Sequence, residues 1–207
     1  NGYQSVERLA NMLSSIDLFD FILTLGDLPE LAGFAKLLPN IPIYSSCWPD
    51  ISPQKHTTSQ KLFDFYFSGR NTLFRQRIIR DLRDKGYKVC TPTVFQRERE
   101  RRNCMLSAKW QINIPQDENW RWVSPMRIIH AWRLGLPTVS INTAVSDAIS
   151  KCVPTVRLEA FSDELEYETS NYNVELTNQL SQYHEMKKTW NGTAIAYTHS
   201  LGSYQNK

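Results

Sequence analysis

The sequence predicts an α/β fold in which helices cover both faces of a parallel β-sheet. Short apolar runs alternate along the chain with amphipathic helical segments, and the turns between them are brief. The apolar runs are nearly continuous, whereas a sheet with one wet face would show strict alternation of apolar and polar residues. These observations together favour parallel strands that are buried on both sides.

The first quarter of the chain has the pattern of two βα units. The expected elements are a helix over 3–15, a strand over 19–25, a helix over 28–38 and a strand over 41–46. Residues 47–58 contain prolines and show no periodicity, which is typical of a linker. We therefore predict two parts: 1–58, a small N-terminal α/β piece plus linker, and 59–207, a second α/β domain with a C-terminal helix.

The second part shows a clearer rhythm. Strands are expected over 62–67, 87–90, 111–114, 138–141 and 155–158, with helices over 71–85, 94–110, 124–134, 143–151 and 162–188. Gly86 is placed to end the first of these helices. Ser162 begins a sequence typical of a capping box, which indicates the start of the last helix.

The helix expected over 124–134 is the most informative segment. Ser124 suits the N-cap, Pro125 suits the first helical position, and Gly135 suits the C-cap. Met126, with Ile129 and Leu134, can face the sheet, whereas Arg127 and His130 lie near the opening turns. Free backbone N–H groups and a guanidinium converge at such a helix start, so it can bind an anion.

Composition excludes several other classes of protein. The chain has 207 residues, 41% of them hydrophobic, and a net charge of +3, which indicates a sizeable core and no general affinity for nucleic acid. The four cysteines have neither disulfide-framework nor metal-site spacing, so we expect a reducing, cytoplasmic location and no bound metal. No apolar run of about 18 residues occurs, and no transmembrane segment is expected.

Ligands of α/β sheets bind beyond the carboxyl ends of the strands. In this sequence those ends are 68–71, 91–93, 115–119, 142–143 and Glu159. Ser68 and Gly69 precede a helix and can offer backbone N–H groups to a phosphate. There is no Gly-x-Gly-x-x-Gly and no Gly-Lys-Ser/Thr loop, which argues against a nicotinamide dehydrogenase and a P-loop NTPase.

Four further side chains have both a functional and a structural interpretation. Arg70 and Arg75 can clamp a diphosphate or can be solvated arginines on a helix face. Lys109 precedes a strand, where a solvated lysine is the simpler interpretation. His130 can contact a ligand, although a histidine at that position is more often packed than catalytic.

Four segments, in this order, resemble the C-terminal, nucleotide-sugar-binding half of the two-domain GT-B glycosyltransferases, especially the bacterial spore-maturation-type, family 1-like group. They are Asp64-Phe-Tyr-Phe-Ser-Gly69, Arg75-Gln-Arg-Ile-Ile-Arg-Asp-Leu82, Met105-Leu-Ser-Ala-Lys-Trp-Gln-Ile-Asn-Ile114 and Ser124-Pro-Met-Arg-Ile-Ile-His-Ala-Trp-Arg-Leu-Gly-Leu-Pro137. The resemblance covers about residues 60–165 and implies a Rossmann-like sheet of GT-B type whose N-terminal half is incomplete here.

The same resemblance implies a site for a nucleotide-diphosphate sugar and transfer of its sugar to an unknown acceptor without a metal cofactor. The residues that it places at the donor are Ser68, Gly69, Arg70, Arg75, Lys109, Ser124, Pro125, Met126, Arg127 and His130. No catalytic base is assigned, because relatives hold the acceptor site mostly in the N-terminal half.

His130 departs from the family, since relatives often carry a glutamate near the ribose, and a neutral imidazole cannot accept two hydroxyl hydrogen bonds as a carboxylate can. Three alternatives therefore stay open. One is another nucleotide-diphosphate enzyme of the same fold, such as an epimerase or a polyol-phosphate transferase. Another is a catalytically degenerate module that binds a partner. The third is binding of an anionic polymer through the basic region 70–102, although its alternating Arg and Glu residues suit a salt-bridged helix face better.

Overall fold

The structure, a computed structural model, confirms the α/β class with a parallel sheet. It describes residues 7, 10–24, 43–45, 48–54, 60–92, 97–119, 123–141, 148–157 and 172–202. The chain divides into two compact units, the first Asn1–Trp48 with Asn191–Lys207, and the second Pro49–Trp190. Within the described residues, no helix combines the length and the apolar character that a membrane crossing requires.

The first unit contains two parallel strands. Residues 10–14 are helical, and they are followed by the short 3-10 helix η1 (Ile16–Leu18), β1 (Ile22–Thr24) and β2 (Ile43–Ser45). β1 pairs with β2 in parallel, with Ile22 opposite Ile43. Both strands lie inside the ranges predicted for them, and the helix expected over 28–38 lies outside the described residues.

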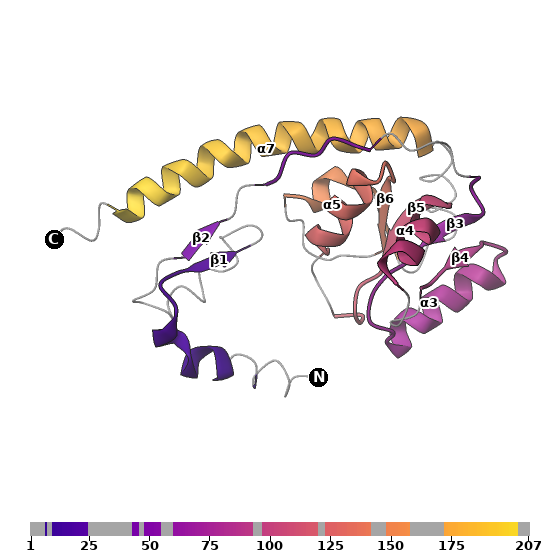
Figure 1. Cartoon of the computed structure of the whole chain (residues 1–207), viewed down its shortest axis with the longest axis horizontal. Helices are drawn as coiled ribbons and strands as arrows, with labels where there is room; N and C mark the ends of the chain where they lie inside the picture. Colours follow the sequence, from indigo (N-terminus) through magenta and orange to yellow (C-terminus); the bar gives the residue numbers. More distant parts are fainter. Residues whose placement is uncertain are drawn as a thin grey trace. The chain divides into compact units, whose positions relative to one another are not determined.

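The second unit is built on a five-stranded sheet in which all neighbouring strands are parallel (Figure 1). Its strands are β3 (Phe63–Tyr66), β4 (Val89–Cys90), β5 (Ala108–Asn113), β6 (Thr138–Ile141) and β7 (Thr155–Val156), in the spatial order β4-β3-β5-β6-β7. Each strand overlaps its predicted range.

β5 begins earlier than predicted. The helix expected over 94–110 ends at Leu106, and the chain is already extended at Ala108. Ala108 and Trp110 are buried while Lys109 between them is exposed. This alternation is the two-residue period of a strand, so the last residues of the predicted helix were wrong.

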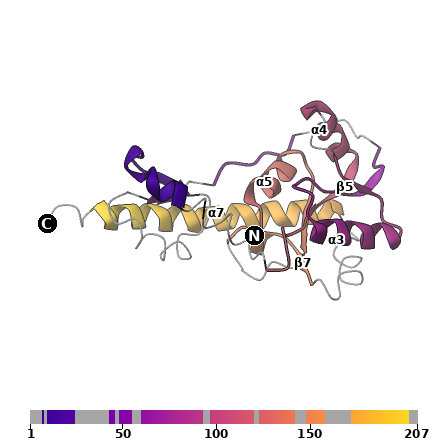
Figure 2. The same cartoon turned by 90° about the horizontal axis from the view of Figure 1, so that it is seen from below.

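Helices cover both faces of the sheet. They are α3 (Leu73–Asp84), α4 (Glu98–Leu106) and α5 (Pro125–Arg133), with a 3-10 turn η3 (Ser150–Cys152) before β7. α3 packs Ile78 and Leu82 against one face, and α4 and α5 pack Met105 and Ala131 against the other. Figure 2 shows α3 on one side of the strands and α4 with α5 on the opposite side.

The predicted signals for the start and end of α5 are largely present. Ser124 is the N-cap and Pro125 the first helical residue, although the Ser124 side chain makes no capping hydrogen bond. Gly135 follows the helix with a φ of +67°, a left-handed conformation that favours glycine. The expectation that Met126 faces the sheet was wrong: its side chain is 60% exposed, and Ile128 and Ile129 supply the buried face instead.

The C-terminal helix α7 (Tyr172–Gly202) runs through residues 172–190 of the second unit, where Gln179 and Tyr183 are buried. Gln179 accepts hydrogen bonds at its Oε1 from Trp132 Nε1 (2.7 Å) and from the Thr138 backbone N–H (2.9 Å), and its Nε2 donates to Thr138 O (2.8 Å). Tyr183, one turn later, packs edge to face against Trp132 with a centroid distance of 5.2 Å. The predicted end of this helix at residue 188 was wrong, because the helix continues through Gly192 to Gly202.

Replacement of Gln179 by leucine is expected to lower the free energy of unfolding by about 2–4 kcal/mol, because buried donors and acceptors on Trp132 and Thr138 lose their partners. Gln182 lies on the same helix but is exposed, so Gln182→Leu is the matched control and should change stability by less than about 0.5 kcal/mol. Urea denaturation followed by circular dichroism measures both variants. Equal effects of the two substitutions would contradict this account of how α7 is attached.

Candidate anion-binding site at the carboxyl edge of the sheet

The strand order places a switch point between β3 and β5. The chain leaves β3 for β4 on one side, and leaves β5 for β6 on the other. Connections that depart in opposite directions leave a crevice between them at the carboxyl edge, where ligands of such sheets bind. α3 follows β3 and α5 follows β5, so both helices begin at this crevice.

Arg75 of α3 is buried at this edge and is held by backbone carbonyls. Its Nε donates to Ile114 O (3.1 Å) and Pro115 O (3.0 Å), and its Nη2 donates to Ile114 O (3.0 Å). Its Nη1 donates to Arg70 O (2.9 Å). One guanidinium therefore joins the segments that follow β3 and β5.

Arg127 of α5 reaches the same edge from the opposite face of the sheet. Its Nη1 donates to Asn113 Oδ1 at 2.7 Å, and Asn113 Nδ2 donates to Ser140 Oγ at 2.9 Å. Asn113 and Ser140 are register partners on β5 and β6, and both are buried. A buried amide therefore holds the guanidinium in place without contributing a charge.

The two guanidiniums converge on Phe67 and Gly69. The Cζ atoms of Arg75 and Arg127 lie 5.3 and 5.6 Å from the centroid of the Phe67 ring. A Cβ added to Gly69 would lie 3.1 Å from Arg127 Nη2 and 3.3 Å from Arg75 Nη1. Glycine therefore allows the backbone to approach both cationic groups closely.

Among the residues that the structure describes, the positive charge at this edge is not balanced by an ion pair. Within the described part of the chain, neither Arg75 nor Arg127 forms an ion pair with a carboxylate. Burial, and then the neighbouring charge of Arg75, lower the pKa of Arg127 to about 10. Burial also lowers the pKa of Arg75, against a smaller opposing effect of Asp117. Both groups stay cationic near neutral pH, and an anion between them would relieve the desolvation and the repulsion.

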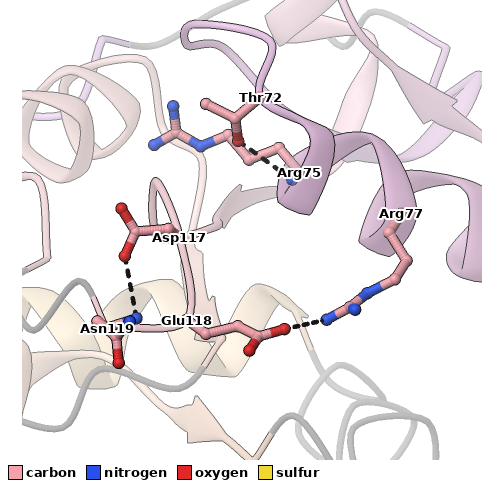
Figure 3. Close-up of polar contacts among 6 residues, drawn as sticks. All are labelled: Thr72, Arg75, Arg77, Asp117, Glu118 and Asn119. Carbon is pink, nitrogen blue, oxygen red and sulfur yellow. Dashed lines mark hydrogen bonds and ion pairs between the residues drawn. The ribbon is translucent and has the colours of Figure 1, made fainter. Parts of the chain in front are cut away.

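The loop after β5 is fastened to the start of α3 (Figure 3). Thr72 Oγ1 donates to Gln116 O at 2.8 Å and accepts from the Arg75 backbone N–H at 3.3 Å. Arg77 forms an exposed ion pair with Glu118 at 2.6 Å. The loop is therefore bonded to the first turns of α3, the helix that carries Arg75.

A cavity of about 680 Å³ opens beside this cluster. Phe67 and Gly69 line both the cavity and the guanidinium cluster, and Ile79 and Pro92 add apolar surface. Pockets for small molecules and cofactors commonly measure about 300–1,000 Å³ and combine apolar walls with a few polar groups. The cavity extends from Gly69 along α3 to Thr91 and Pro92, and neither Arg75 nor Arg127 lines it.

The structure brings most of the predicted site residues to this edge. Ser68 and Gly69 follow β3, and Ser124 to Arg127 form the start of α5. Pro125 has no N–H, and the N–H groups of Arg127 and Ile128 bond to Ser124 O. Among the described residues, this leaves the Met126 N–H as a first-turn donor without a partner.

Two predicted residues are exposed at the margin. The Arg70 side chain is exposed, although its carbonyl oxygen accepts from Arg75. His130 is also exposed and lies three residues after Arg127, hence on the same side of α5. The role of both side chains toward a ligand stays a prediction.

Lys109 does not join the cluster. It is the second residue of β5, four residues before Asn113, which corresponds to about 13 Å along a strand. Its Nζ instead contacts Asp64 Oδ1 at 2.9 Å. The position of Lys109 near the amino end of β5 thus argues against the expectation that it faces a diphosphate.

Phe67, Asn113 and Ser140 were not predicted as site residues. Phe67 and Asn113 lie at the carboxyl ends of apolar strands, where sequence alone suggested only core packing. An asparagine that ends an otherwise apolar strand is a usable signal, because a buried amide must find partners. Nothing in the sequence around Ser140 indicates its contact with Asn113.

Comparison with known proteins supports the fold class. No protein-family model and no curated protein matches the sequence. The structure is similar to the crystal structure of TarM, a GT-B glycosyltransferase, with a TM-score of 0.52 and 12% sequence identity. The match covers 97% of this chain and 46% of the TarM chain, so the chain spans about half the length of that protein. The fold is therefore α/β and Rossmann-like, as in a GT-B neighbour.

Proposed function

We propose that this chain binds the nucleotide-diphosphate sugar in a glycosyltransferase that moves the sugar to an acceptor. The observation that carries the proposal is the pair of guanidiniums, Arg75 and Arg127, which converge at the switch point without a carboxylate partner among the described residues. The GT-B-like fold supports the same assignment.

The chemistry of the transfer suits these groups. The bond between the anomeric carbon and the diphosphate oxygen breaks as a bond to the acceptor oxygen forms, and negative charge grows on the leaving diphosphate. Cationic groups and helix dipoles that are already oriented stabilise such charge. Arg127 Nη2, the Gly69 backbone and the first turn of α5 would hold the diphosphate, and Arg75 would add charge from behind.

The rest of the donor would extend along the crevice. Arg70 and His130 border the crevice with exposed side chains, and the cavity beside Gly69 offers further space. His130 stands where the resemblance to GT-B glycosyltransferases places a ribose. Since the guanidiniums supply the positive charge, we expect binding to need no metal ion.

Titration of the full chain with UDP, GDP, ADP and their sugars tests this proposal. Isothermal calorimetry in the presence of EDTA should give saturable binding to at least one nucleotide, and the free nucleotide should compete with its sugar conjugate. A chain that binds inorganic pyrophosphate equally well, with no preference for any nucleotide, would contradict the donor-site assignment. So would a chain that binds no nucleotide at all.

Substitution of Gly69 by alanine should weaken nucleotide binding about tenfold, equivalent to about 1.4 kcal/mol. The added Cβ would lie 3.1 Å from both Phe67 Cζ and Arg127 Nη2. Phe67 is buried, so Arg127 is the side chain that must move. Dissociation constants from calorimetry measure the effect.

Gly86→Ala is the matched control. A Cβ at Gly86 would have no neighbour within 4 Å, but its φ of +91° is unfavourable for other residues. This substitution should therefore lower thermal stability and leave nucleotide affinity unchanged. The reverse pattern, with affinity lost at Gly86 and kept at Gly69, would place the ligand elsewhere.

A further inference from the structure

We infer that Asn113, supported by Ser140, is a positioning residue that presents Arg127 to the anion as a cation with no carboxylate partner among the described residues. This inference rests on the proposed function, because it concerns the same anion site. It adds a specific role for a buried, neutral side chain on β5 that does not itself need to contact the ligand.

The first step is the orientation of Arg127. Its Nη1 donates to Asn113 Oδ1 at 2.7 Å, while its Nη2 lies beside Gly69. The planar guanidinium has its donors in a fixed arrangement. A bond that fixes Nη1 therefore also fixes the direction in which Nη2 points, toward the Gly69 backbone and the crevice.

The second step is the orientation of Asn113. An amide can be turned by 180°, which would present Nδ2 to Arg127 and place two donors face to face. The bond from Asn113 Nδ2 to Ser140 Oγ, at 2.9 Å, favours the orientation in which Oδ1 faces Arg127. Asn113 and Ser140 are 1% and 0% exposed, so water does not compete for these bonds.

The third step is charge. An aspartate at this position would accept the same bond from Arg127 and could accept one from the Ser140 hydroxyl. It would also neutralise the guanidinium and so remove the attraction for a ligand anion. An amide instead provides the acceptor and leaves the positive charge available.

Asn113→Asp therefore separates charge from shape, since the two side chains are nearly isosteric. We expect its affinity for UDP and for inorganic pyrophosphate to fall at least tenfold, while the thermal midpoint of the ligand-free chain stays at or above that of the wild type. Asn113→Leu removes the acceptor altogether, so it should lower both affinity and the thermal midpoint. If Asn113 had only a structural role, Asn113→Asp would not lower ligand affinity while leaving the thermal midpoint unchanged.

Calorimetric titration and scanning calorimetry of the three full-length chains decide the matter. Unchanged pyrophosphate and UDP affinity in Asn113→Asp would overturn the inference and leave the proposed function intact. A thermal midpoint of Asn113→Asp as low as that of Asn113→Leu would also overturn the inference. So would a wild-type chain that binds no pyrophosphate. If the wild type binds pyrophosphate without preferring any nucleotide, and Asn113→Asp loses that binding, the inference stands and the proposed function fails.

Discussion

Replacement of Arg75 by alanine should lower the free energy of unfolding by about 3–4 kcal/mol. Arg75 is 6% exposed, and its guanidinium donates to the carbonyl oxygens of Ile114, Pro115 and Arg70. Each buried acceptor that loses its partner costs about 1–3 kcal/mol, reduced where water can enter. Because these carbonyls belong to the segments after β3 and β5, the crevice itself should loosen. Urea denaturation measures the change.

Arg77→Ala is the matched control on the same helix. Arg77 is 55% exposed and pairs with Glu118, which is 59% exposed, and such surface pairs contribute about 0–1 kcal/mol. Arg75→Lys adds a second comparison, since a lysine keeps the charge but lacks the planar fork that reaches several carbonyls. If Arg75→Ala lowers the free energy of unfolding no more than Arg77→Ala does, the carbonyl contacts of Arg75 do not stabilise this edge. The same conclusion follows if Arg75→Lys is as stable as the wild type.

The fold class was predictable because strands buried on both faces leave a local signature in the sequence. The ranges of β3 and β6 and the caps of α5 follow from residues within one or two turns of each boundary. The start of β5 was misplaced because Ala108 and Trp110 also suit a helix, and only their pairing with β3 decides for the strand. The attachment of α7 through Gln179 joins residues 41 positions apart, and no local pattern indicates it.

The meeting of the glycine turn with the start of α5 was predictable, but the separate contacts of the two arginines were not. Parallel strands bring their carboxyl ends to one edge, so the glycine turn and the start of α5 had to meet there. Whether an arginine binds a ligand or the backbone depends on where its guanidinium points. The sequence places Arg75 on a helix, but its contacts with Ile114 and Pro115 lie 39 and 40 residues away. For the same reason Lys109, on the correct strand, is at the wrong end.

The two arginines should therefore behave differently when they are removed. Arg75 has carbonyl partners for its Nε, Nη1 and Nη2, whereas Arg127 has one neutral acceptor on Nη1 and a second nitrogen beside Gly69. Loss of Arg75 disrupts the protein backbone around the site. Loss of Arg127 removes a poorly compensated charge, and its main consequence should fall on the ligand.

Arg127→Ala should weaken binding of UDP and pyrophosphate about 10- to 100-fold, as for loss of a charge-assisted contact worth about 1.5–3 kcal/mol. The thermal midpoint of the ligand-free chain should stay within about 2 °C of the wild type, because the lost bond to Asn113 is offset by the loss of a desolvated charge.

The pKa of Arg127 is lower in the folded chain, about 10, than its ordinary value, so release of its proton favours folding. The wild type should consequently gain stability relative to Arg127→Ala as the pH rises past about 10. Arg133→Ala, at an exposed position on the same helix, should change neither affinity nor this pH dependence. Full nucleotide affinity in Arg127→Ala would show that the anion lies elsewhere, whereas a large loss of stability would show that this arginine, like Arg75, serves the fold.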